Sequence, residues 1–93
     1  PAIHDLMARA GLALRELGLR TKQASVVCEA LECFLSAQRV YQEAAHYQAS
    51  NVEYSIQTIL SELHDRFDDR TYQECYSRHA AALREIPGGR NTE

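Results

Sequence analysis

The chain has 93 residues, a formal net charge of −3 and 25% charged residues, a composition that fits one small soluble domain. Basic residues are interleaved with acidic ones, whereas a nucleic-acid surface needs a concentrated basic footprint, so nucleic acid is not expected as the main partner. No apolar stretch reaches the about 18 residues of a membrane-spanning helix, so no transmembrane segment is expected.

The first predicted helix covers residues 3–17. Gly18 suits the left-handed position that follows many helix C-termini, which predicts a Schellman ending there. Leu12 lies off the main apolar stripe of this segment. The residues that share the stripe are Ile3, Leu6, Met7, Ala10, Ala13, Leu14 and Leu17.

The second predicted helix, residues 22–47, contains no Gly or Pro and is apolar around most of its circumference. Thr21 is its expected N-cap. A helix apolar this far round must be covered on several sides, so we expect it to be the central helix of a bundle. Cys28 and Leu35 flank its main stripe on one side, and Cys33, Val40 and Tyr47 flank it on the other. The stripe itself, expected to be core, comprises Val27, Ala30, Leu31, Phe34, Ala37, Tyr41, Ala44 and Ala45.

Whether the chain turns near residue 50 is the main open question of the fold. Ser50 and Glu53 form a capping-box pattern, which favours a new helix beginning at Asn51. The apolar stripe nevertheless continues almost in phase through Val52 to Phe67, so one bent helix of roughly 45 residues, about 68 Å long, is the alternative. We favour the break, because so long a helix is unusual in a compact domain.

A last helix is expected from Thr71, which forms a second capping-box pattern with Glu74, to Ile86, where Pro87 stops it. No strand pattern is present. The sequence therefore predicts an all-α fold, a small three- to four-helix bundle with a long central helix. We expect residues 1–86 to form this single domain and residues 87–93 to be a flexible tail or linker, which suggests a domain excised from a larger intracellular protein; a processed native start at Pro1 is the alternative.

Three cysteines are present, an odd number without the spacing of a secreted disulfide scaffold. We therefore expect free thiols that act as small buried hydrophobes, in a reducing, cytoplasmic environment.

Two residue pairs have the spacing of metal ligands. Glu43 and His46 form a Glu-x-x-His pair, but a di-iron bundle needs two such pairs and two further Glu residues. Cys75 and His79 lie on one helical face, but a structural zinc ion needs four ligands. We expect no metal and no cofactor, and keep a metal- or ligand-binding bundle only as the alternative function.

Catalytic chemistry is not expected. His64 lies four residues before Asp68, whose carboxylate would raise the imidazole pKa, but the simpler role of this segment is a charged helix end. Nucleophile-elbow, cysteine-protease and phosphate-loop signatures are absent. The sequence thus indicates a protein that is not an enzyme.

Apolar residues that lie off the predicted core stripes suggest an interaction surface. Leu12, Leu35, Val40, Tyr47 and Tyr54 are the predicted partner-binding residues. Tyr is enriched at protein interfaces, and a groove between helices accepts an amphipathic partner helix. The sequence therefore predicts a non-catalytic adaptor, scaffold or self-association domain whose partner is an amphipathic helix or a second protomer.

Overall fold

The computed structural model describes residues 3–44 and 49–86. The fold there is all-α, as predicted, and its helices are α1 (Ile3–Thr21), α2 (Ala24–Glu43), α3 (Ala49–Arg66), α4 (Asp69–Arg78) and α5 (Ala80–Arg84).

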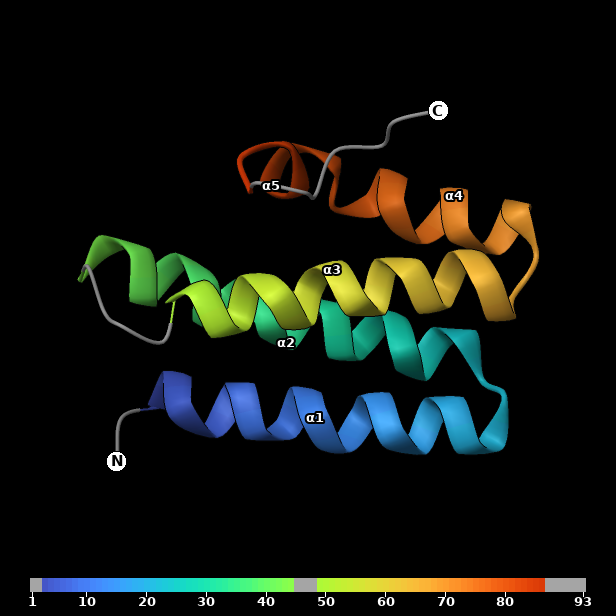
Figure 1. Cartoon of the computed structure of the whole chain (residues 1–93), viewed down its shortest axis with the longest axis horizontal. Coiled ribbons are helices and arrows are strands. Elements are labelled where there is room, and N and C mark those ends of the chain that lie inside the picture. The colour runs from blue at the N-terminus through green and yellow to red at the C-terminus, as the bar shows by residue number, and fades with distance from the viewer. Residues whose placement is uncertain (1–2, 45–48, 87–93) are drawn as a thin grey trace.

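The helices form an up-and-down bundle in which α2 and α3 run antiparallel at the centre (Figure 1). Helix α1 lies along one side of this pair, and α4 and α5 lie on the other. The longest dimension of the molecule is 36 Å, far short of the about 68 Å that one continuous helix would need. The predicted break between the second and third helices is therefore confirmed.

The core lies where α2 meets its neighbours, which explains why α2 is apolar around most of its circumference. Val27, Leu31 and Phe34 are each no more than 1% exposed, as the main stripe predicts. Ala44 is exposed, because α2 ends before it, and Ala45 and Tyr47 lie outside the described residues. Helices α3, α4 and α5, together with Ile86 just after α5, complete the core; the buried residues there are Val52, Ile56, Ile59, Leu60, Leu63, Tyr72, Cys75, Tyr76, Leu83 and Ile86.

The end of α1 differs from the sequence prediction. Lys22, with a φ of 58°, takes the left-handed position, and the N–H groups of Lys22 and Gln23 donate to the carbonyls of Leu19 and Gly18. This is the Schellman pattern, four residues later than predicted. Thr21 ends α1 rather than capping α2, and Gln23 is the N-cap of α2.

Gly18 is needed inside α1 because α2 approaches it closely. A Cβ at this position would lie 2.6 Å from Val27 Cγ2 and 2.8 Å from the Val27 backbone nitrogen, a clash that no side-chain rotation removes. Glycine therefore serves helix packing at residue 18, and the helix runs on to Thr21.

A prediction follows for the α1–α2 turn. Lys22→Gly is expected to raise the free energy of unfolding by up to about 1 kcal/mol, because glycine adopts a positive φ without the steric cost borne by lysine. Urea unfolding followed by circular dichroism measures the change. Lys22→Ala is the matched control, since it keeps the Cβ and should leave stability near the wild-type value.

The apolar stripe predicted for the first helix is only partly covered. Met7 and Leu14 are half-buried, but Leu6 is 51% and Leu17 is 48% exposed. The face of α1 that packs against α2 is instead centred on Gly11 and Gly18, both buried. The sequence prediction missed this because glycine carries no apolar side chain to mark a packed face.

The later helix boundaries also depart from the capping-box predictions. Helix α3 begins at Ala49, so Ser50 lies within it and not before it. Asp68, rather than Thr71, caps α4: its carboxylate accepts a 2.8 Å hydrogen bond from the Thr71 N–H, and the interactions with Thr71 lower the pKa of Asp68. The predicted single last helix is broken at His79, which closes α4 and opens α5.

Candidate functional site

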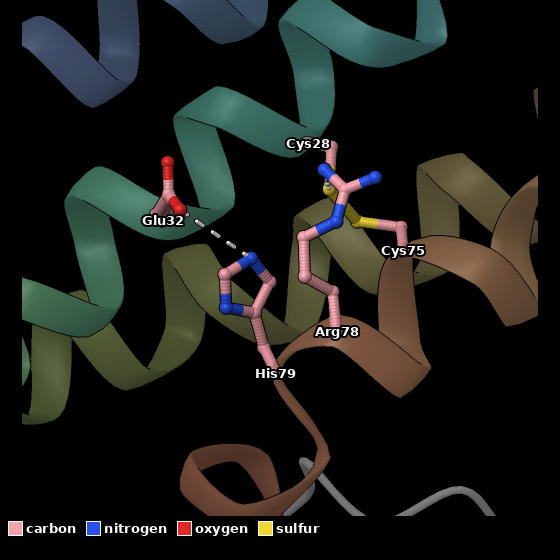
Figure 2. The surroundings of a disulfide bond; sticks show 5 residues. All are labelled: Cys28, Glu32, Cys75, Arg78 and His79. Carbon is pink, nitrogen blue, oxygen red and sulfur yellow. Dashed lines mark hydrogen bonds and ion pairs between the residues drawn. A yellow bond between two sulfur atoms is a disulfide. The ribbon is translucent and has the colours of Figure 1, made fainter.

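A disulfide joins Cys28 of α2 to Cys75 of α4, with their Cα atoms 6.1 Å apart (Figure 2). The expectation that these two residues are free thiols is wrong. It failed because the cysteines are 47 residues apart, and only the packing of α4 beside α2 brings them together. Cys33 is free and half-buried, and burial together with the carboxylates of Glu32 and Glu29 raises its pKa.

The disulfide anchors a small polar cluster between α2 and the end of α4. The Arg78 guanidinium lies over the bond, with Nη1 3.9 Å from Cys28 Sγ (Figure 2). His79 points toward α2, where its Nε2 is 3.9 Å from the Glu32 carboxylate. The cross-link thus holds the α4–α5 junction against one face of α2.

Beside this cluster lies a groove of about 700 Å³, a volume within the usual range of binding sites. Helix α2 contributes half of the lining residues, α5 and the residues around it form the opposite wall, and Met7 of α1 contributes at one side. The apolar lining consists of Met7, Leu35, Val40, Ala81, Ala82 and Ile86. The lining also contains charged residues of both signs, namely Glu32, Arg39, Arg78 and Glu85, and the polar residues Ser36, Gln38, Gln42 and His79.

Two polar side chains in the lining each bury an atom that has no hydrogen-bond partner among the described residues. Gln38 is only 1% exposed; its Nε2 donates to Glu53 over 2.8 Å, but its Oε1 is unpaired. His79 Nε2 is the second such atom. Buried polar atoms in folded proteins are normally paired, so this part of the groove is suited to a polar group from a binding partner.

The structure brings only part of the predicted interaction surface together. Leu35 and Val40, which the sequence placed on opposite flanks of α2, both line the groove, because it spans the outward face of that helix. Leu12 on α1 and Tyr54 on α3 are 53% and 71% exposed and lie outside the groove lining. Tyr47 lies outside the described residues.

No sequence pattern indicates that Met7, Gln38 and the α5 segment line the same groove as Leu35. Met7 and Gln38 belong to different helices, and the bend at His79 that sets the opposite wall has no clear sequence signal. Periodicity could show only that Leu35 and Val40 lie on the flanks of the α2 stripe.

Of the two residue pairs with the spacing of metal ligands, the Cys75–His79 pair is not available as the sequence implied. The sulfur of Cys75 is in the disulfide, so it cannot join His79 as a thiolate ligand. Glu43 is exposed at the end of α2, and His46 lies outside the described residues. Within residues 3–44 and 49–86, no group of three or more His, Cys, Asp or Glu side chains could hold a metal ion.

His64 interacts with neighbours other than the predicted Asp68. Its Nδ1 is 3.5 Å from the Asp65 carboxylate, and its ring meets the Tyr72 ring edge-on. Asp68 is engaged as the cap of α4.

None of the described helices combines the length and apolar character that crossing a membrane requires.

No protein-family model, curated protein or solved structure matches this chain.

Proposed function

We propose that this chain is a non-catalytic protein-interaction domain that binds an amphipathic helix of a partner protein in the groove along α2. The observation that carries the proposal is the meeting of Leu35 and Val40 in one groove with Met7 and Ile86. An exposed flank of a central helix thereby becomes a concave surface with apolar walls, which is how helix-binding domains recognise their partners.

The chemistry of the lining defines the partner. Side chains at helical spacing, three and four residues apart, would place apolar groups on Leu35, Val40 and Ile86. One polar side chain that donates a hydrogen bond would pair with Gln38 Oε1, which has no partner among the described residues. Acidic and basic groups at the rim would fix the direction of the helix more than they add affinity.

The proposal is tested with a displayed library of amphipathic helical peptides, from which binders of the oxidised protein are selected. Leu35→Asp places a charge on the apolar wall and is expected to weaken binding of the selected peptides by at least roughly tenfold. Titration calorimetry measures the affinities. Leu12→Asp and Tyr54→Ala are matched controls, because they alter exposed predicted residues outside the groove and should leave affinity unchanged.

Two results would refute this use of the groove. One is the failure of any helical peptide to bind the folded protein. The other is a set of peptides that bind Leu35→Asp as well as wild type but lose affinity for Leu12→Asp or Tyr54→Ala, which would move the site to α1 or α3.

The disulfide bears on the cellular setting of the domain. The cytoplasmic setting is predicted from free thiols, and the Cys28–Cys75 bond removes that support. Structural disulfides are typical of oxidising compartments. We therefore propose that the domain binds its partner in an oxidising compartment, or that it belongs to a protein exposed to both oxidising and reducing conditions.

A further inference from the structure

The outer face of α1 carries a second apolar surface that shares no residue with the groove. Leu6, Ala10, Ala13 and Leu17 are all exposed, and they follow one another at intervals of four, three and four residues. This is the spacing of the a and d positions of a coiled-coil seam. We call these four residues the α1 seam. Arg20 occupies the next position of the repeat and ends it.

The order of residues in the α1 seam is palindromic. Leucines stand at both ends and alanines in the middle, so a twofold axis between Ala10 and Ala13 would place Leu6 of one copy against Leu17 of the other. Each Ala10 would then meet an Ala13, and their small side chains would allow the two helices to approach closely. A surface complementary to itself in this way is what a symmetric dimer requires.

The charges beside the seam fit the same arrangement. Arg9 and Glu16 are exposed, lie seven residues apart and flank the seam on one side. In an antiparallel pair, flanking positions of this type face one another across the seam, so Arg9 of each copy would face Glu16 of the other. In a parallel pair Arg9 would instead face the opposite flank, where Met7 and Leu14 are half-buried against the bundle.

We propose that α1 pairs with α1 of a second copy of this chain, antiparallel, through the α1 seam and with reciprocal Arg9–Glu16 ion pairs. The observations behind this are the exposed palindromic seam and the complementary charges beside it. Because the seam is short, the dimer is weak and depends on concentration.

Sedimentation equilibrium over protein concentrations up to the millimolar range tests the pairing. The average mass is expected to rise from one copy toward two. Leu6→Glu should abolish this rise, whereas Leu12→Glu, on the same helix but outside the seam, should not alter it. All these positions are exposed, so the variants keep the fold, which circular dichroism verifies.

A charge exchange tests the orientation. Arg9→Glu alone sets glutamates against glutamates and is expected to weaken dimerisation at low salt by several-fold. The double variant Arg9→Glu with Glu16→Arg should restore dimerisation.

A chain that stays monomeric at every concentration overturns the proposal, as does a dimer whose stability is unchanged by Leu6→Glu. A dimer lost in Arg9→Glu but not restored by the double variant overturns the antiparallel register. Peptide binding in the groove is measured on the same variants and should be unaffected, so the two proposals fail separately.

Discussion

Replacing Cys28 and Cys75 together by alanine is expected to lower the free energy of unfolding by roughly 4 kcal/mol. The bond closes a loop across a sequence separation of 47 residues, and a loop of that length removes much conformational entropy from the unfolded chain. The bundle is small, so a loss of this size is a large part of its total stability. Urea unfolding under non-reducing conditions measures it.

Cys33→Ala is the matched control for the disulfide variant. Cys33 is free and half-buried, so this change should cost far less than loss of the bond. A thiol count on the unfolded, non-reduced protein should give one thiol per chain, because two of the three cysteines are bonded. Three titratable thiols, together with unchanged stability of the Cys28→Ala, Cys75→Ala variant, would contradict the bond.

Phe34→Ala is expected to lower the free energy of unfolding by about 3–5 kcal/mol, the usual cost of removing a buried aromatic ring. The ring is 1% exposed and packs directly over Gly11, where an added Cβ would come within 2.9 Å of its Cε2 atom. The neighbouring Leu35→Ala should cost much less stability, because that side chain is only half-buried in the groove.

Substitution of Gly11 tests the packing of α1 against Phe34 more specifically. Gly11→Ala alone should destabilise the protein, since the clash with the Phe34 ring outweighs the higher helix propensity of alanine. In the Phe34→Ala background the clash is gone, so the same change should become stabilising by about 1 kcal/mol. If the changes in unfolding free energy caused by Gly11→Ala and Phe34→Ala are additive in the double variant, α1 does not pack on Phe34 through Gly11.

Periodicity predicted the elements whose apolar side chains mark a packed face. The stripe of α2 through Val27, Leu31 and Phe34 is core, and the chain turns between α2 and α3 as the preference for a compact domain indicated. The same reasoning failed for α1, because its packed face is marked by Gly11 and Gly18, which no hydrophobic pattern can show. Leu6 and Leu17, which the pattern grouped with half-buried Met7 and Leu14, lie exposed as a result.

The candidate site was predictable only one side chain at a time. Leu35 and Val40 could be recognised as flanking residues, but their union in one groove depends on the bend at His79 and on the disulfide beside it. Both are consequences of tertiary packing. The cysteine pairing in particular connects helices that local sequence rules treat separately.

The most direct test of the proposed function is an NMR titration of isotopically labelled, oxidised protein with a helical peptide selected for binding. We predict chemical-shift changes that centre on the groove residues Leu35, Val40, Ala82 and Ile86, with little change at Tyr54 on α3 or at Ala13 in the α1 seam. Changes that centre on Tyr54 or on the α1 seam, while the groove residues stay unperturbed, would contradict the proposal that the groove binds the partner helix.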